Sequence, residues 1–228
     1  MNDKEELHMS AALEQIRIEA ERHQKFGPAW ALMRELRVIL DGHFWTHDMG
    51  HTGYYYTTLP LFLTGSIWTI VQELAAAIDA SVKREITVVA GAQFGGNIIA
   101  QGLVNLISAA GPARTIHCIH IEKEFGLVGK DLGKTNYAIR DYFRDFLSGT
   151  RVLLVDDVRR SGRNMKLFEA LLKDANASVV ATASIIDASF VEHPGRHFSV
   201  WKAPEGDRYT PGPQTCPMCA SGTPITKF

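Results

Sequence analysis

The chain of 228 residues has no long apolar run, no excess of charge of one sign and only three cysteines. No stretch approaches the roughly 18 consecutive apolar residues that a membrane-spanning helix needs. The formal net charge of −1 provides no long-range attraction for nucleic acid. Three cysteines do not make a secreted disulfide framework, and the acidic residues 2–6 do not resemble a signal peptide. We therefore expect a cytoplasmic protein that binds neither membrane nor nucleic acid.

The composition is that of a globular protein, with 46% hydrophobic and 21% charged residues. The length suits one principal domain with appendages. Residues 1–40 have two stretches with helical spacing of apolar residues, and Pro28 is well placed to open the second, which extends to Leu40. The residues after 203 are rich in proline, which favours an extended tail. We divide the chain into N-terminal helices and a base-side segment (1–58), a core (59–202) and a tail (203–228).

The middle of the chain alternates between helical and strand patterns. This alternation predicts an α/β fold with a mostly parallel central sheet flanked by helices and connected by right-handed crossovers. Residues 152–155 form an aliphatic run without polar alternation, which is typical of a central strand buried on both faces. The predicted helices cover 66–80, 96–109 and 164–175, and the predicted strands cover 86–90, 115–121, 151–155 and 178–186.

Two acids follow the buried run directly, and a small-residue turn follows the acids. Asp156 and Asp157 are therefore expected at the carboxyl edge of the sheet, where open α/β folds bind ligands. Ser161 and Gly162 break the pattern before the next helix, whose first N–H groups are free to bind an anion. Carboxylates beside an anion site suit a sugar phosphate. The alternative is an ordinary strand-turn-helix unit in which the acids cap the helix.

A second turn between a strand and a helix is rich in glycine. Residues 86–90 run into Gly91-Ala92-Gln93-Phe94-Gly95-Gly96, and a helical pattern follows. Such a corner can expose backbone N–H groups to pyrophosphate oxygens. The glycines can equally serve only to allow tight packing of the helix on the strand.

The run Val-Asp-Asp-Val-x-x-Ser-Gly resembles the phosphoribosyl-pyrophosphate loop of type I phosphoribosyltransferases. This resemblance implies the fold of that family, with N-terminal helices, a flexible loop that covers the site, called the hood, and an extended tail. It also implies that Asp156 and Asp157 bind the ribose hydroxyls. By the same resemblance, the 5-phosphate contacts are Arg160, Ser161, Gly162, Arg163 and Asn164, and the pyrophosphate contacts are Ala92, Gln93, Phe94, Gly95 and Gly96.

The 5-phosphate turn departs from the family pattern. Family members usually have Thr-Thr-Gly-Gly-Thr or Thr-Thr-Gly-Ala-Thr, whereas this chain has Arg160-Ser161-Gly162-Arg163-Asn164. The two arginines could hold phosphate through paired hydrogen bonds, or they could block the close backbone approach. This departure keeps open a second interpretation, in which the chain is a regulator or nucleotide sensor with the same fold and altered catalysis.

The segment between the predicted strands at 115–121 and 151–155 is long, cationic and spaced by glycines. It resembles the hood of the family, which brings a cation to the leaving pyrophosphate. Lys123 is the first candidate for that cation because it follows the strand directly. The alternative is a solvated surface loop.

Upstream of the core, Gly50, His51, Thr52 and Tyr54 resemble the base-side segment of orotate phosphoribosyltransferases. Three histidines lie nearby, His43, His47 and His51, but their spacing gives no helix face that could bind a metal. We expect no metal ligands among them.

The tail contains the run Cys216-Pro-Met-Cys219, which is half of a four-cysteine zinc site. The third cysteine, Cys118, stands alone in a predicted strand, so two chains would have to share an ion to complete such a site. The same run resembles the ending of some bacterial orotate phosphoribosyltransferases.

The family resemblance implies transfer of ribose 5-phosphate from phosphoribosyl pyrophosphate to a nucleobase, with orotate as the first choice and pyrimidine nucleotide synthesis as the setting. It implies Mg²⁺ as the cofactor, bound mainly by substrate oxygens and water, so we assign no protein metal ligands. It also implies a homodimer.

Overall fold

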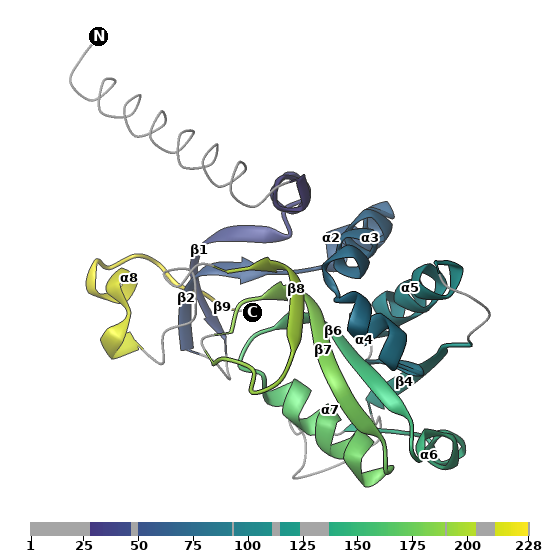
Figure 1. Cartoon of the computed structure of the whole chain (residues 1–228). Coiled ribbons are helices and arrows are strands. Elements are labelled where there is room, and N and C mark those ends of the chain that lie inside the picture. Colours follow the sequence, from purple (N-terminus) through teal and green to yellow (C-terminus); the bar gives the residue numbers. More distant parts are fainter. Residues whose placement is uncertain are drawn as a thin grey trace, which may run out of the picture.

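The computed structural model describes residues 28–46, 50–92, 94–110, 115–123, 137–189, 191–203 and 213–227. Its centre is a six-stranded sheet with the order β5-β4-β3-β6-β7-β8 (Figure 1). All neighbouring strands are parallel except β5, which runs antiparallel to β4. The strands are β3 (Val88–Ala92), β4 (His117–Lys123), β5 (Tyr137–Ala138), β6 (Arg151–Arg159), β7 (Ser178–Asp187) and β8 (His197–Lys202). The predicted α/β class is confirmed.

The aliphatic run of β6 is buried between two helix layers. Leu153 and Val155 point to one hydrophobic cluster, and Val152 and Leu154 point to the other. This alternation follows from the two-residue period of a strand, and it explains why no polar residue interrupts the run.

Helices cover both faces of the sheet (Figure 1). The helical residues 28–35 contribute buried residues to the first cluster, as do α2 (Leu59–Thr64), α3 (Ile67–Ala77), α4 (Ala80–Glu85) and α5 (Gly95–Ala109). Those that contribute to the second are α6 (Asp141–Leu147) and α7 (Arg163–Asp174). Among the described residues, no helix has the length and apolar character that crossing a bilayer requires.

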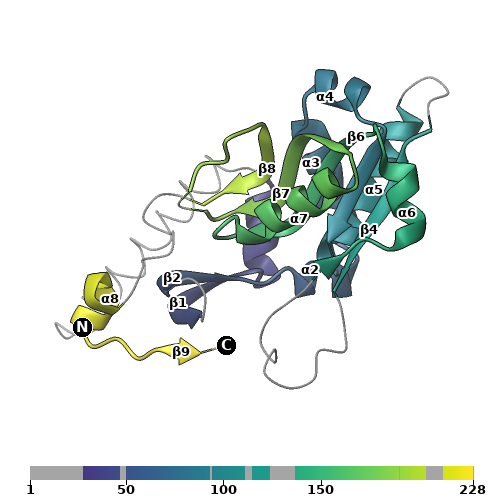
Figure 2. The ribbon, with the colours of Figure 1, turned by 90° about the horizontal axis from the view of Figure 1, so that it is seen from below.

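A second, three-stranded sheet stands beside the core, as Figure 2 shows. Its order is β2-β1-β9, and it joins the N-terminal part of the chain to the tail. The strands are β1 (Ile39–Thr46), β2 (Gly50–Tyr56) and β9 (Thr226–Lys227). In the tail, the 3₁₀ turn η2 (Pro213–Thr215) and helix α8 (Pro217–Ala220) come before β9. β1 and β2 form an antiparallel hairpin, whereas β9 runs parallel to β1.

The N-terminal segment differs from the sequence-based prediction. Residues 28–35 are helical, as Pro28 indicates, but the helix does not extend to Leu40. Arg37 has a positive φ of 55°, which turns the chain, and β1 begins at Ile39. Burial of Val38 and Ile39 in the core outweighs the helical spacing of the leucines. The first predicted helix lies outside the described residues.

The tail also differs from the prediction. It contains η2, α8 and β9 rather than extended chain alone. The pairing of β9 with β1 shows that part of the predicted tail packs with part of the predicted N-terminal segment.

Candidate functional site

A cavity of about 620 Å³ opens at the carboxyl ends of β3 and β6. In the sheet, β4 lies on one side of β3 and β6 lies on the other. The strand order therefore reverses between β3 and β6. Open α/β sheets bind ligands at this switch point. The described lining residues are Tyr55, Tyr56, Thr57, Thr58, Leu59, Phe62, Ala92, Phe94, Gly95, Tyr137, Asp156, Asp157, Val158, Arg159, Arg160, Ser161, Gly162, Arg163, Asn164 and Met165.

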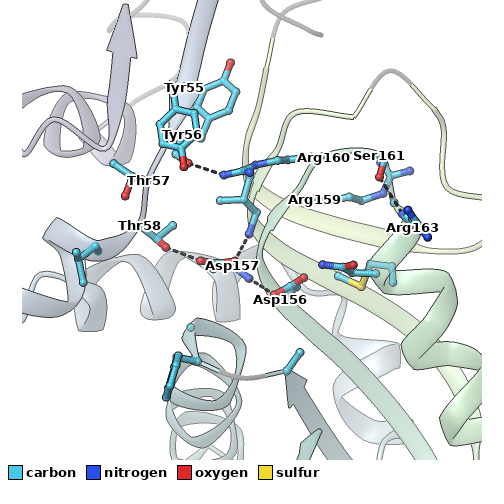
Figure 3. A pocket seen from close by; sticks show the side chains of 18 of the residues that line it. Tyr55, Tyr56, Thr57, Thr58, Asp156, Asp157, Arg159, Arg160, Ser161 and Arg163 are labelled. Carbon is cyan, nitrogen blue, oxygen red and sulfur yellow. Dashed lines mark hydrogen bonds between the residues drawn. The ribbon is translucent and has the colours of Figure 1, made fainter. Parts of the chain in front are cut away.

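The acid pair lies in this cavity, as predicted from its place after the buried strand (Figure 3). Asp157 is held from two sides: its Oδ1 accepts the N–H of Val158 at 2.8 Å, and its Oδ2 accepts the hydroxyl of Thr58 at 2.5 Å. Asp156 Oδ1 accepts the backbone N–H of Asp157 at 3.0 Å. The carboxylates are therefore oriented before any ligand binds.

The electrostatics of the pair favour a ligand that supplies hydroxyl groups or positive charge. Burial raises the pKa of Asp156 well above its usual range, and the neighbouring Asp157 raises it further. Burial also raises the pKa of Tyr137, with Asp156 and Asp157 adding to the effect. Hydrogen-bond donors or a cation at this place would relieve the repulsion between the two carboxylates.

The turn of residues 160–164 borders the same cavity. Gly162 caps α7 with a φ of +73°, a left-handed conformation that favours glycine, and the N–H of Arg163 donates to Ser161 Oγ at 3.2 Å. Arg160 reaches away to donate to the carbonyl of Tyr56 at 3.0 Å, and the Arg163 residue is exposed. The turn at the start of α7 thus remains accessible, and it suits an anion because the first N–H groups of a helix lack partners within the helix.

The glycine corner packs closely, and part of it also lines the cavity. A Cβ at Gly91 would lie 2.1 Å from the carbonyl oxygen of Gly96, so these glycines let β3 and α5 pack closely. Gly96 is buried and does not appear among the described lining residues. Gly95 does line the cavity, and a Cβ there would lie 2.9 Å from Asp157. Ala92 and Phe94 also line it, and Gln93 lies outside the described residues.

The predicted cation, Lys123, is exposed at the last position of β4, where its register partner is Tyr137. Tyr137 lines the cavity, whereas Lys123 is not among the described residues that do so. Sequence reasoning missed Tyr137, because it lies in a two-residue strand within the segment that resembles the hood, and no local pattern marks it.

The predicted base-side residues lie elsewhere. Gly50, His51, Thr52 and Tyr54 belong to β2, but the described cavity wall takes residues 55–58 from the end of that strand instead. The reason is the direction of β2, because only its last two residues, Tyr55 and Tyr56, reach the cavity. In the sequence, the run of three tyrosines at 54–56 was the feature that could have indicated this part of the cavity wall.

A second polar cluster lies outside the cavity wall. The ligand atoms of His43, His51, Cys216 and Cys219 all lie within 4.8 Å of one another. The sequence predicted no metal ligands among the histidines and only half a site at the cysteines. The fold brings the two halves together, whereas His47 lies outside the described residues. Burial lowers the pKa of His51, and the neighbouring His43 lowers it further.

Comparison with solved structures defines the fold as that of the phosphoribosyltransferases. The chain superimposes on an orotate phosphoribosyltransferase from Aeropyrum pernix with a TM-score of 0.55 and 18% identity, over 75% of this chain and 92% of the other. An adenine phosphoribosyltransferase from Rhodothermus marinus gives a TM-score of 0.54 and 17% identity, over 77% and 100%.

Comparison of sequences finds orotate phosphoribosyltransferases among the similar proteins. The orotate phosphoribosyltransferase of Carboxydothermus hydrogenoformans is 24% identical over 200 residues, which cover 87% of this chain and 94% of that protein. The orotate phosphoribosyltransferase of Thermotoga maritima is 26% identical over 199 residues, with 86% and 94% covered. No protein-family model matches the chain. The resemblance to type I phosphoribosyltransferases, and among them to orotate phosphoribosyltransferases, is confirmed by these similarities.

Proposed function

We propose that this chain is a phosphoribosyltransferase that moves ribose 5-phosphate from phosphoribosyl pyrophosphate to a nucleobase, with orotate as the preferred base. The observation that carries the proposal is the convergence of the acid pair, the 160–164 turn and Gly95 on one cavity. The names of the relatives support the same chemistry.

Each part of the cavity wall matches one part of the donor substrate. Asp156 and Asp157 accept hydrogen bonds from the ribose hydroxyls, and the turn of residues 160–164 holds the 5-phosphate. The N-terminus of α5 at Gly95 faces the pyrophosphate, which suits the partial positive charge of a helix start. Thr58 keeps Asp157 in the orientation that the ribose requires.

The reaction is a displacement at the anomeric carbon of ribose, in which positive charge develops on the sugar ring. The two fixed carboxylates stabilise that charge, and the cavity orients base and sugar for attack. The carboxylate oxygens are hard donors that also suit Mg²⁺. Mg²⁺ held beside Asp156 and Asp157 would supply charge neutralisation for the departing pyrophosphate.

The wall at the end of β2 suits a planar anionic base. Tyr55 offers an aromatic face, and the Arg160 guanidinium lies 5.2 Å from the centre of that ring. An aromatic face next to a fixed cation binds a planar carboxylate such as orotate better than a neutral base.

Homodimer formation and a role in pyrimidine nucleotide synthesis belong to the same proposal.

Turnover measurements test the proposal directly. The purified chain is incubated with phosphoribosyl pyrophosphate, Mg²⁺ and one base from the set orotate, uracil, hypoxanthine and adenine, and nucleotide and pyrophosphate are quantified. We expect Mg²⁺-dependent formation of both products with orotate. Product with another base alone would refute the choice of orotate, and no product with any base would refute the transferase activity.

The altered turn supports a second candidate, a regulator or nucleotide sensor that binds phosphoribosyl pyrophosphate without turnover. Its support is Arg160, which stands where the family usually has a small hydroxyl residue. The Arg160 side chain donates a hydrogen bond to the carbonyl of Tyr56. The double variant Arg163→Gly, Asn164→Thr separates the two candidates. Activity that appears only in the variant favours the sensor, whereas activity already present in the unmodified chain favours the enzyme.

A further inference from the structure

The two buried histidines lie on neighbouring strands of the small sheet. His43 belongs to β1 and His51 to β2, and the two residues are 2% and 3% exposed. The register of the hairpin shifts between Asp41 and Phe44, so the residue pairing is irregular beside His43. His43 Nε2 and His51 Nδ1 approach to 2.8 Å. The hairpin therefore presents two imidazole nitrogens to one point.

The two cysteines of the tail complete the cluster. Cys216 caps α8 and Cys219 lies one turn later, so the Cys-x-x-Cys spacing turns both thiols toward the hairpin. Cys216 Sγ lies 3.4 Å from His43 Nε2, and Cys219 Sγ lies 3.6 Å from the same atom and 3.2 Å from His51 Nδ1. Four ligand atoms from three segments of the chain thus face one another.

Four of the six separations between these ligand atoms are close to the edges of a tetrahedral zinc site. With Zn–N of about 2.0 Å and Zn–S of about 2.3 Å, two nitrogens lie about 3.3 Å apart and a nitrogen and a sulfur lie about 3.5 Å apart. Three of the four N···S distances, at 3.2–3.6 Å, fall around that value, and all four ligand atoms lie within 4.8 Å of one another. The N···N distance of 2.8 Å needs an opening of about half an ångström, which small side-chain rotations supply.

The surroundings of His43 fix the nitrogen that can bind a metal. Its Nδ1 lies 2.7 Å from the carbonyl oxygen of Thr223 and therefore carries the proton. Its Nε2, which faces the cluster, then presents a lone pair. An outer hydrogen bond to a carbonyl is the usual way in which proteins orient a metal-binding histidine.

We propose that His43, His51, Cys216 and Cys219 form a structural Zn²⁺ site that fastens the C-terminal segment to the β1–β2 hairpin. Two thiolates and two imidazoles in tetrahedral arrangement select Zn²⁺ over the oxygen-preferring Mg²⁺ and Ca²⁺. Four protein ligands close the coordination sphere, which is typical of a structural site. None of the four is among the described residues that line the large cavity.

The tail needs such an anchor because its own elements are short. Helix α8 has four residues and β9 has two, and each is too small to be stable alone. The anchor also lies on the hairpin whose strand β2 continues into the cavity wall at Tyr55 and Tyr56. Zn²⁺ therefore stabilises the wall on which the base is proposed to rest. The zinc site itself does not depend on the proposed transferase function.

Metal analysis of the purified full chain tests the proposal. We expect one equivalent of zinc per chain after dialysis against metal-free buffer. Replacement by Co²⁺ should give the intense visible absorption of tetrahedral cobalt together with thiolate charge-transfer bands. Titration of the thiols of the unmodified chain with an organomercurial should release the zinc, and this measurement needs no variant to fold.

Two single variants provide the matched comparison. Cys219→Ser should lower zinc content well below one equivalent and weaken the cobalt bands, because it removes one thiolate. Cys118→Ser changes a cysteine of β4 outside the cluster, so it should keep one equivalent and the full spectrum. A chelator should lower the melting temperature of the Cys118→Ser chain and of the unmodified chain alike.

Three results would overturn the proposal. The first is a chain that contains no zinc and takes up no Co²⁺ while Cys216 and Cys219 are free thiols. The second is a disulfide between these two cysteines, found by mass spectrometry of the chain prepared under reducing conditions. The third is half an equivalent of metal per chain, which would mean an ion shared between two copies. All readouts are independent of transferase activity.

Discussion

At the scale of single residues, Asp157 combines a fixed orientation with a place in the cavity wall. Its two carboxylate oxygens accept hydrogen bonds from Val158 and Thr58. The side chain is therefore already ordered, and ligand binding costs little of its conformational entropy. Asp156 beside it has a raised pKa because of burial. The two carboxylates therefore differ in environment although they are adjacent in sequence.

The substitution Asp157→Asn should weaken binding of phosphoribosyl pyrophosphate with Mg²⁺ by about tenfold to a hundredfold, because hydrogen bonds to a charged group contribute about 1.5–3 kcal/mol. Isothermal titration calorimetry measures the affinity, and thermal unfolding measures stability in parallel. Asp145→Asn, which changes an exposed acid of α6, is the control and should leave affinity unchanged. Equal affinities of the Asp157 variant and the control would exclude the ribose role.

Arg159 and Asp187 form a buried ion pair next to the 160–164 turn. Arg159 Nη1 donates to Asp187 Oδ1 at 2.8 Å, and the two residues are 4% and 5% exposed. Asp187 Oδ1 also accepts the N–H of Ser189, and Arg159 Nη2 donates to the carbonyl of Val191. The pair thus ties the end of β6 to the end of β7.

Removal of one partner should be costly because the other charge stays buried. We expect Asp187→Ala to lower the free energy of unfolding by about 3–5 kcal/mol, measured by urea denaturation. Arg144→Ala breaks an exposed pair with Asp141 and should change stability by less than about 1 kcal/mol. A similar small loss for both variants would show that the buried pair is not a stabilising contact.

At the scale of secondary-structure elements, the contact between β3 and α5 depends on the absence of side chains. The corner brings the backbone of Gly91 against that of Gly96, and Gly96 against the carbonyl oxygen of Val155 on β6. This close packing places the start of α5 over the end of β6, where Gly95 touches Asp157. The geometry of the cavity floor therefore follows from three glycines.

Gly91→Ala should consequently destabilise the protein by about 3 kcal/mol or more, because a Cβ 2.1 Å from a backbone oxygen forces β3 and α5 apart. Gly53→Ala is the matched control on β2, where the nearest atom is 3.8 Å from the added Cβ. It should change the free energy of unfolding by less than about 1 kcal/mol. Chemical denaturation compares the two, and equal stabilities would contradict the packing argument.

At the scale of the whole molecule, the partly buried His197 links stability to pH. Burial lowers the pKa of His197 to about 4; the positive charges of Arg159, His193 and Lys202 also lower it, against the opposing effect of Asp187. Its ring nitrogens lie 2.8 Å from Thr182 Oγ1 and 3.1 Å from Ser184 Oγ. Ser184 donates its own proton to the carbonyl of Ile186, so it accepts from His197. The site fits a neutral imidazole.

The unfolded chain binds a proton at His197 near pH 6.5, whereas the folded chain binds it only near pH 4. The contribution of this residue to stability is therefore complete above pH 6.5 and is lost at up to about 1.4 kcal/mol per pH unit as the pH falls toward 4. Urea denaturation across this range should show a steeper decline for the unmodified chain than for His197→Gln. His117→Gln, which changes an exposed histidine of β4, should keep the original slope; identical slopes for all three chains would contradict the assignment.

The sequence by itself determined the features that are local in the chain. The buried run of β6, the acids that follow it and the turn that opens α7 lie within about a dozen consecutive residues, and short-range periodicity and turn chemistry are enough to place them. The same reasoning predicted the parallel sheet and the glycine corner, and the resemblance to phosphoribosyltransferases depends on these local motifs.

Only the tertiary structure decided which distant segments meet. Thr58 reaches Asp157 across 99 positions, and Cys216 reaches His43 across 173, and neither contact leaves a trace in residue spacing. Tyr137 likewise enters the cavity wall through a two-residue strand. Because loop-closure entropy grows only slowly with loop length, many pairings of distant segments have similar cost. The order of the strands and the packing of the core select among them, and that selection assembled both the cavity and the four-residue metal cluster.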